Sequence, residues 1–260
     1  MNVNLFSDYK TIWWAKDNSL DTLYNYIKNY KFDIDGYGNI TVTNSDNKSV
    51  PVFCCHLDTV HSDKPYPKVL KDDVLISMNE HGIGGDDKCG IVACLELLKK
   101  VECKVIFFRD EEVGCRGAKV YNQNTLKKDL FMVEIDRKGS GDLIFNSSFM
   151  NEMASEEFMK DVEKIGKDFD YKSTNGLYTD VSQLSECGIS RMNISAGYYL
   201  PHTNKEYVIL SELDNAINFC VRLALNLTKQ YKHKIKEVKV VNANCTDNFF
   251  FGDYGSKAQG

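Results

Sequence analysis

The stretch VPVFCCH, residues 50–56, is an apolar run interrupted by a single proline, and it ends on a histidine. Apolar runs without polar alternation are typical of strands buried on both faces. Two further runs repeat the pattern, at 103–108 (CKVIFF) and 130–135 (LFMVEI), and acidic residues follow each closely. Helices with one apolar face are predicted at 90–100 and 155–167. Helices and strands in alternation predict an α/β fold with a mainly parallel sheet.

Weaker signals extend this pattern toward both ends of the chain. A helix is predicted to begin after Ser19, and Thr-Val-Thr alternation predicts a half-buried strand at 40–43. Further along, a strand is predicted at 189–196 and a long amphipathic helix at 212–229, with Ser211 as its N-cap. The same architecture therefore spans most of the sequence.

The composition is that of an ordinary globular protein, with 43% hydrophobic and 27% charged residues among 260. We expect residues 1–231 to form a single domain and 232–260 a C-terminal strand or tail. The net charge of −5 argues against general binding to nucleic acid. No apolar run approaches the ~20 residues of a membrane span, and no signal peptide is recognised. The nine cysteines form no CxxC pair, which predicts reduced thiols and a cytoplasmic location.

Histidine and carboxylate side chains stand where the predicted strands end or helices begin. They are His56 and Asp58, Asp86 and Asp87, Glu111 and Glu112, Asp136, and His202. Each group alone could be a solvated loop pair, a turn or a helix cap. In an open α/β sheet, however, sites form beyond the carboxyl ends of the strands. Convergence of these groups on one edge predicts a site for divalent metal of borderline hardness.

Five segments in this order resemble the motifs of the di-zinc metallo-exopeptidases, a superfamily that includes peptidase T, aminoacylase and the single-domain aminopeptidases. They are HLDTV (56–60), GGDDKCG (84–90), DEEVG (110–114), the strand-ending Asp136 and PHTNKE (201–206). The resemblance covers residues 17–230. It implies a three-layer α/β/α fold with a central mixed, mainly parallel sheet. It also implies two bound divalent metal ions, zinc by preference and cobalt or manganese as alternatives.

The resemblance assigns a metal-binding role to five positions. Asp86 would bridge the two metals, His56 and Asp136 would complete one site, and His202 and Glu112 would complete the other. Because each site combines histidine with carboxylate, both suit a metal such as zinc.

The resemblance also assigns the residues that would move protons. Glu111 would be the general base, and Asp58 would orient His56 from behind the metal. Since neighbouring residues of a strand point to opposite faces, we expect Glu111 and Glu112 to lie in a bulge or loop. The family commonly has a cis peptide after its bridging aspartate, which corresponds here to the bond between Asp86 and Asp87.

The sequence departs from part of the family in length. Relatives of peptidase T insert a lid or dimerisation domain between the strand-ending aspartate and the last histidine, and the tetrahedral aminopeptidases insert one before the bridging aspartate. Neither insertion has room here, between Asp136 and His202 or between His56 and Asp86. We therefore expect a minimal catalytic core without a lid.

Three residues are candidates for substrate contacts. Asp180 lies in a Thr-Asp segment that resembles one near the site of aminopeptidase relatives, and it could hold a substrate ammonium group or support His202. Arg137 could bind a substrate carboxylate, and Tyr198 could hydrogen-bond the oxyanion. The alternatives are a helix cap for Asp180, a surface position for Arg137 and aromatic packing for Tyr198.

These expectations define the candidate functions. The first is a metal-dependent aminopeptidase acting on short peptides. The second is another amide hydrolase on the same core, a deacylase, dipeptidase or carboxypeptidase whose substrates include N-acyl amino acids. The third is a binding protein that has kept the fold without catalysis. The sequence does not specify the oligomeric state.

Overall fold

The buried run at 50–56 forms a central strand of the main sheet, and its side chains explain why the sheet is covered on both faces. The computed structural model describes residues 4–147 and 150–234. In β3 (Val52–His56), Phe53 and Cys55 belong to one apolar cluster, whereas Val52 and Cys54 belong to another. Because successive side chains of a strand point to opposite faces, one apolar strand supplies both layers of the core.

The main sheet of the described residues has nine strands, of which eight follow one another in the order β1-β2-β6-β3-β7-β11-β8-β10, with β9 paired to β8. The strands are β1 (Lys31–Ile34), β2 (Ile40–Thr43), β3 (Val52–His56), β6 (Lys104–Phe108), β7 (Met132–Arg137), β8 (Asp142–Ser147), β9 (Met150–Glu152), β10 (Lys172–Gly176) and β11 (Arg191–Ser195). The central strands β6, β3, β7 and β11 run parallel, and antiparallel pairs flank them. This is the mixed, mainly parallel sheet that the sequence predicts.

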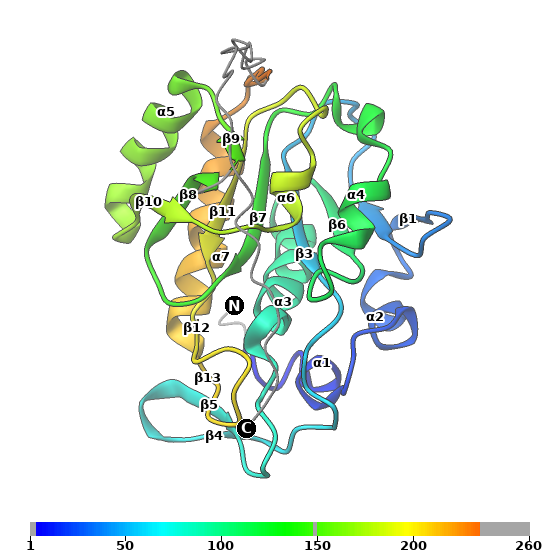
Figure 1. Cartoon of the computed structure of the whole chain (residues 1–260), viewed down its shortest axis with the longest axis vertical. Coiled ribbons are helices and arrows are strands. Elements are labelled where there is room, and N and C mark those ends of the chain that lie inside the picture. Colours follow the sequence, from blue (N-terminus) through cyan, green and yellow to red (C-terminus); the bar gives the residue numbers. More distant parts are fainter. Residues whose placement is uncertain (1–3, 148–149, 235–260) are drawn as a thin grey trace, which may run out of the picture.

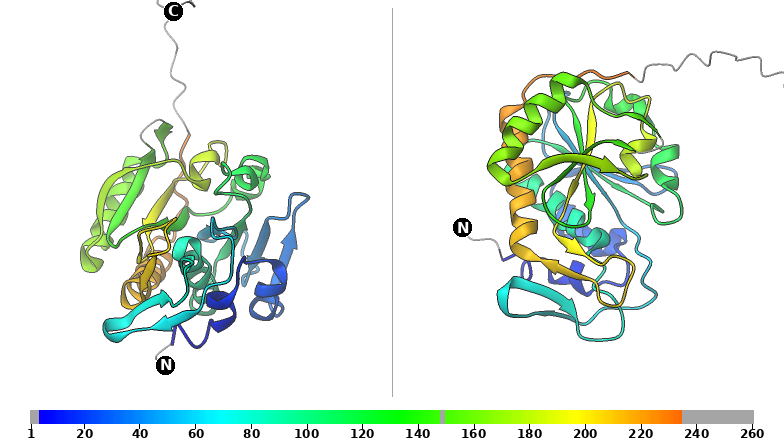
Figure 2. Two further views of the ribbon diagram at one scale, coloured as in Figure 1. Left: turned by 60° about the horizontal axis from the view of Figure 1, so that its bottom comes forward. Right: turned by 60° about the vertical axis from the view of Figure 1, so that its left-hand side comes forward.

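A smaller antiparallel sheet lies beside the main one, in the order β12-β13-β5-β4. Its strands are β4 (Pro67–Val69), β5 (Val74–Ser77), β12 (Tyr198–Tyr199) and β13 (Tyr207–Ile209). Figure 2 shows the β4–β5 hairpin extending away from the main sheet. Strands this short carry too few residues for an apolar pattern to be recognised, and the sequence did not predict this sheet.

Helices cover both faces of the main sheet (Figures 1 and 2). They are α1 (Lys10–Trp14), α2 (Leu20–Ile27), α3 (Gly85–Lys100), α4 (Arg116–Val120), α5 (Glu156–Gly166), α6 (Asp180–Gln183) and α7 (Leu210–Asn226), with short 3-10 turns at Lys71–Asp73, Gln123–Leu126 and Lys167–Phe169. Buried residues of α1, α2, α3, α5 and α7 share one cluster, and those of α4 and α6 share the other. The three-layer α/β/α prediction is therefore confirmed.

The boundaries of the last helix differ from the prediction. We expected Ser211 to cap a helix at 212–229, but α7 begins at Leu210 with Ile209 at the N-cap position and ends at Asn226. The strand β13 leads directly into the helix, and Leu210 is buried, so packing sets the first turn rather than the capping preference of serine. The expected helix at 155–167 is confirmed, with the Ser155 hydroxyl accepting the N–H of Phe158.

Other expectations concern the thiols, the tail and the surface. All eight cysteines of the described residues are buried and unbridged. Lys232 forms a single β-bridge with Ile189, and the part of the expected tail from residue 235 onward lies outside the described residues.

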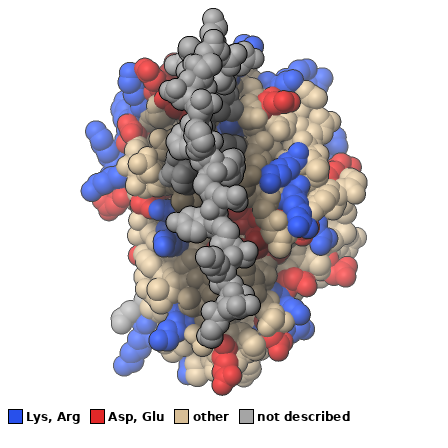
Figure 3. Space-filling model, in the orientation of Figure 1, with Lys and Arg blue, Asp and Glu red and all other residues tan. Residues whose placement is uncertain are grey.

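Within residues 4–147 and 150–234, none of the helices combines the length and apolar character needed to cross a bilayer. On the face shown in Figure 3, the coloured basic and acidic side chains are interspersed.

Candidate metal centre

Adjacent strands bring the predicted site residues to one edge of the sheet. Strands β6, β3 and β7 are neighbours and run parallel, so their carboxyl ends meet. His56 ends β3, Asp136 lies near the end of β7, and Glu111 and Glu112 lie in the turn after β6. Asp86 enters from the start of α3, with His202 completing the group from the turn after β12.

Asp86 lies between the two histidines. Its Oδ1 atom is 3.0 Å from His56 Nε2, and its Oδ2 atom is 3.3 Å from His202 Nε2. Asp136 Oδ1 is 3.8 Å from His56 Nε2, and Glu112 Oε2 is 3.2 Å from His202 Nε2. We refer to His56, Asp136 and Asp86 as the His56 half-site, and to His202, Glu112 and Asp86 as the His202 half-site. The two half-sites thus share one carboxylate.

Asp58 supports the site from behind. His56 Nδ1 lies 2.9 Å from the carbonyl oxygen of Asp58 and 3.4 Å from its Oδ1 atom. If Nδ1 donates there, Nε2 is the nitrogen left to bind a metal. The Asp58 carboxylate also accepts the backbone N–H groups of Glu111 (3.0 Å) and Glu112 (3.1 Å). One residue therefore orients a histidine and fixes the turn that carries the glutamate pair.

The two glutamates of this turn have different surroundings. Both lie outside any strand, as expected, and the preceding Asp110 has a left-handed backbone with φ 58°. Glu112 contacts His202, whereas Glu111 Oε1 accepts a weak hydrogen bond from Cys115 Sγ at 3.4 Å. Glu111 makes no ion pair with either histidine in the described structure, so its carboxylate stays available for another task.

Electrostatics in this cluster favour a bound cation. Burial raises the pKa of Glu112 to about 7, with the charge of Asp86 adding to the effect, and burial raises the pKa of Asp136 well above its usual range. The hydrogen bond with Asp86 raises the pKa of His202 to about 9. Carboxyl groups crowded in a buried volume resist joint ionisation, and divalent cations relieve this repulsion.

The donor set fits divalent metal. Ligand atoms of His56, Asp86 and Glu112 lie within 4.8 Å of one another, and so do those of His56, Asp87 and Asp136. The Glu112 Oε1 atom is buried and has no hydrogen-bond partner. Since buried carboxylate oxygens are normally paired, an orphan beside two histidines suits a metal ligand.

Asp87 is close to the cluster but is used in another way. One of its oxygens accepts the N–H of Gly90 at 2.9 Å, and the other accepts the N–H of His56 at 3.3 Å. It therefore caps the helical part of α3 and ties that helix to β3. The expected cis peptide between Asp86 and Asp87 is present.

The three candidates for substrate contacts lie in different environments. Tyr198, only 3% exposed, donates its hydroxyl to Asp136 Oδ1 at 2.9 Å. Arg137 lines the cleft beside the cluster and pairs with Asp142 at 3.2 Å. Asp180 is fully buried, and neither of its carboxylate oxygens has a hydrogen-bond partner. Of the three, only Arg137 has a partly exposed side chain that a substrate can reach without rearrangement.

Two residues that position the candidate ligands were not assigned roles from the sequence. Glu206 accepts the N–H groups of Gly84 (2.8 Å) and Asp86 (3.0 Å), and His61 Nε2 lies 2.7 Å from its carboxylate. Asn193 accepts the N–H of Asp136 at 3.0 Å and donates to its carbonyl at 2.7 Å. Glu206 ends the PHTNKE motif, so its place in that motif was the available signal. Asn193 had none, because its partner is distant in sequence.

A three-layer α/β fold with a histidine–carboxylate cluster at the carboxyl ends of its parallel strands defines a metallohydrolase of the exopeptidase type. The family model of peptidase family M28 matches residues 38–218. The chain belongs to peptidase family M28, and it is a metallopeptidase.

Solved structures share this fold at low sequence identity. The aminopeptidase PepT from Bacillus cereus ATCC 10987 superposes with a TM-score of 0.73 at 13% identity, covering 86% of this chain and 98% of that one. A tripeptidase from Staphylococcus aureus subsp. aureus Mu50 gives 0.68 at 15%, covering 85% and 96%. The TET1 peptidase of Pyrococcus horikoshii gives 0.61 at 17%, covering 85% and 99%. No curated protein sequence matches the chain significantly.

Proposed function

We propose that this metallopeptidase uses two metal ions to remove the N-terminal residue from short, unblocked peptides. The observation that carries the proposal is the position of Asp86, whose two oxygens face two different histidines at 3.0 and 3.3 Å. A carboxylate with one ligand-bearing half-site on each side is suited to bridge a pair of metals. Zinc suits the mixed nitrogen and oxygen donors, with cobalt or manganese as substitutes.

The protein residues have separate tasks in this proposal. Two divalent ions, when bound, would acidify a water molecule and stabilise negative charge on the scissile carbonyl oxygen. Glu111 accepts the proton of the attacking water and passes it to the leaving amine. Asp58 holds both the tautomer of His56 and the turn that carries Glu111, through the contacts at 2.9 and 3.0 Å. Glu112 serves as a ligand and not as the base.

The charges that line the cleft support aminopeptidase polarity. Asp86, Glu111, Glu112 and Asp136 line a cleft of about 240 Å³. Together with the nearby Asp58, these carboxylates keep a negative field even after two bound dications are counted. Such a field favours a free ammonium group next to the scissile bond. Arg137 lines the same cleft, together with the exposed Lys138, and suits the C-terminal carboxylate of a short peptide. We therefore assign Arg137 to binding that carboxylate.

The other two candidates have supporting rather than contact roles in this proposal. The Tyr198 hydroxyl is engaged with Asp136 at 2.9 Å, so we assign it to positioning that ligand. Asp180 lies behind the cleft, buried near Glu134 and Glu111, and burial raises its pKa well above the usual range, which disfavours its charged form. The similar PepT and tripeptidase structures, which are described as an aminopeptidase and a tripeptidase, agree with this substrate class.

A substrate panel tests the proposal. Amino-acid anilides and their N-acetylated counterparts are assayed after adding zinc, cobalt or manganese to the metal-free protein. Losing the ammonium contact should cost ~1.5–3 kcal/mol, or about ten- to a hundredfold in kcat/KM. Equal rates on free and acetylated substrates would replace this proposal with a deacylase or carboxypeptidase. Metal binding without turnover of any substrate would favour a non-catalytic binding protein.

A further inference from the structure

A second pocket lies beside Asp58. It has a volume of about 280 Å³ and is formed by the segment before and into α2, the β1–β2 hairpin, and the ends of β3 and β6. Its lining includes Asp58, which contacts His56, but none of the five proposed metal ligands. The pocket therefore shares Asp58 with the metal centre but contains none of its proposed ligands.

The pocket contains a guanidinium group that forms no ion pair with any described residue. Arg109 follows β6 and is exposed, with its backbone N–H bonded to Asn39 Oδ1 at 3.1 Å. Its side chain lies against Gly38, where an added Cβ would be only 3.0 Å from Arg109 Cδ. The glycine, at φ 103°, gives the arginine room to lie over the hairpin and face the pocket. An unpaired guanidinium is suited to bind a carboxylate.

The pocket also contains an exposed carboxylate, that of Asp17, which forms no ion pair with any described residue. The neighbouring Asn18 is only 3% exposed, and its backbone N–H is bonded to Leu57 O at 3.3 Å, which fixes this segment beside the end of β3. A carboxylate in this position suits an ammonium group.

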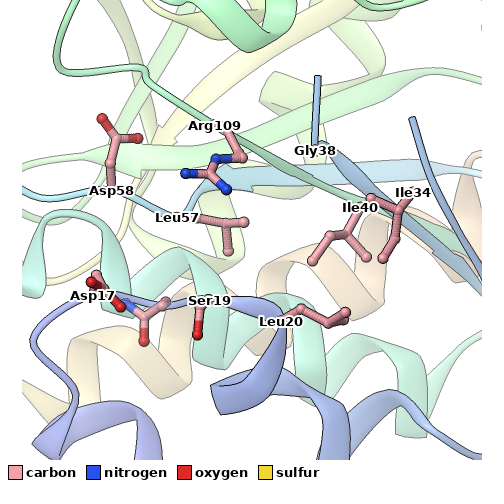
Figure 4. A pocket seen from close by; sticks show the side chains of 10 residues that line it. Asp17, Ser19, Leu20, Ile34, Gly38, Ile40, Leu57, Asp58 and Arg109 are labelled. Carbon is pink, nitrogen blue, oxygen red and sulfur yellow. The ribbon is translucent and has the colours of Figure 1, made fainter. Parts of the chain in front are cut away.

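Apolar side chains form the remainder of the lining. Figure 4 shows Leu57 and Arg109 near the middle, Asp17 and Asp58 to one side, and Ile34, Ile40 and Leu20 to the other. The accessible lining is mainly apolar, and Ile34 is 41% exposed although it is large and hydrophobic. The pocket therefore separates a charged end, which carries both signs, from a hydrophobic end.

We propose that this pocket binds a free amino acid with an apolar side chain. The carboxylate pairs with Arg109, the ammonium group is held by Asp17, and the side chain packs on Ile34, Ile40 and Leu20. Amino acids are also what the proposed peptidase activity releases, so the ligand class rests in part on that function. Asp58 lines the pocket and also holds His56 and the glutamate turn. We therefore expect an amino acid bound in the pocket to affect the metal centre.

Calorimetric titration of the metal-loaded protein with L-leucine tests the site. Arg109→Met should weaken binding about ten- to a hundredfold, the range of a lost charge-assisted hydrogen bond. The matched control is Arg116→Met, which removes an exposed arginine at the start of α4, outside the pocket, and should leave the affinity unchanged. Asp17→Asn, checked for folding by its Tm, should weaken L-leucine binding as well.

Analogues separate this site from amino acids bound at the metals. 3-Methylbutylamine lacks the carboxylate and has no amide bond to cleave, so it should bind more weakly than L-leucine and lose nothing further in Arg109→Met. 4-Methylpentanoate, which lacks the ammonium group, should be insensitive to Asp17→Asn. Equal L-leucine affinity in the wild type and Arg109→Met, or no binding at millimolar concentration, would overturn the proposal. These titrations involve no turnover, so a protein that binds leucine through Arg109 but cleaves no peptide would overturn only the proposed function.

Discussion

The two half-sites share Asp86 but are built in different ways. His56 ends a central strand, its side chain is fully buried, and Asp58 holds its second nitrogen. His202 lies in a turn, its side chain is 52% exposed, and its backbone has φ 63°. The first half-site is thus part of the core, and the second is assembled from loops. We expect the His56 half-site to bind its metal more tightly, because less of it must be ordered on binding.

The largest expected effect comes from a residue that belongs to neither half-site. Glu111→Gln should lower kcat by ~10²–10⁴-fold, because it removes the general base, while both metals remain bound. Metal analysis alongside steady-state kinetics checks this. If the variant lost a metal, Glu111 would be a ligand and the roles of the two glutamates would be exchanged.

The histidines should differ in what they contribute to folding. In the metal-free protein, His56→Ala should lower the free energy of unfolding by about 1–3 kcal/mol, because it removes a partner of the buried Asp86 carboxylate and of the half-buried Asp58 carbonyl. His202→Ala should change it by less than about 0.5 kcal/mol, since the side chain is half exposed. Urea unfolding with a chelator present measures both. Equal losses would remove the contrast between a core half-site and a loop half-site.

Asp58 links the half-sites, and its replacement tests how far that support extends. Asp58→Ala removes the carboxylate that accepts the N–H groups of Glu111 and Glu112, and should cost about 10–100-fold in activity or metal affinity. The matched variant Asp63→Ala removes an exposed carboxylate whose ion pair among the described residues is with His81, and it should be neutral. Activity equal to wild type in Asp58→Ala would show that the turn needs no such support.

The smallest effect should come from the hydrogen bond between Tyr198 and Asp136. Tyr198→Phe removes one hydrogen bond of 2.9 Å and should weaken metal binding at the His56 half-site by about 0.5–1.5 kcal/mol. Competition with a chelator should show one of the two metals released more readily and the other unchanged. A loss of both metals would mean that Tyr198 also supports the shared carboxylate.

Sequence patterns predicted where the residues of the His56 half-site lie better than they predicted the residues that position them. His56 and Asp136 lie at the ends of long apolar strands, and runs of this kind are typical of central strands buried on both faces. The start of α7 was predicted at Glu212 because Ser211 is a good N-cap, yet β13 continues into Leu210 and packing determines the boundary. The roles of Glu206 and Asn193 depend on contacts between residues 57 to 122 positions apart. Apart from the place of Glu206 in the PHTNKE motif, the local sequence contains no signal for such pairings.

The central claim is that Asp86 is shared by two metal sites of different construction. A crystal structure grown with zinc, with anomalous differences collected on both sides of the zinc edge, tests it most directly. The account predicts two zinc peaks that both contact Asp86, one beside His56 and Asp136 and the other beside His202 and Glu112. As zinc is withdrawn, the peak beside His202 should fade first. A single peak, or two peaks without Asp86 between them, would contradict the account.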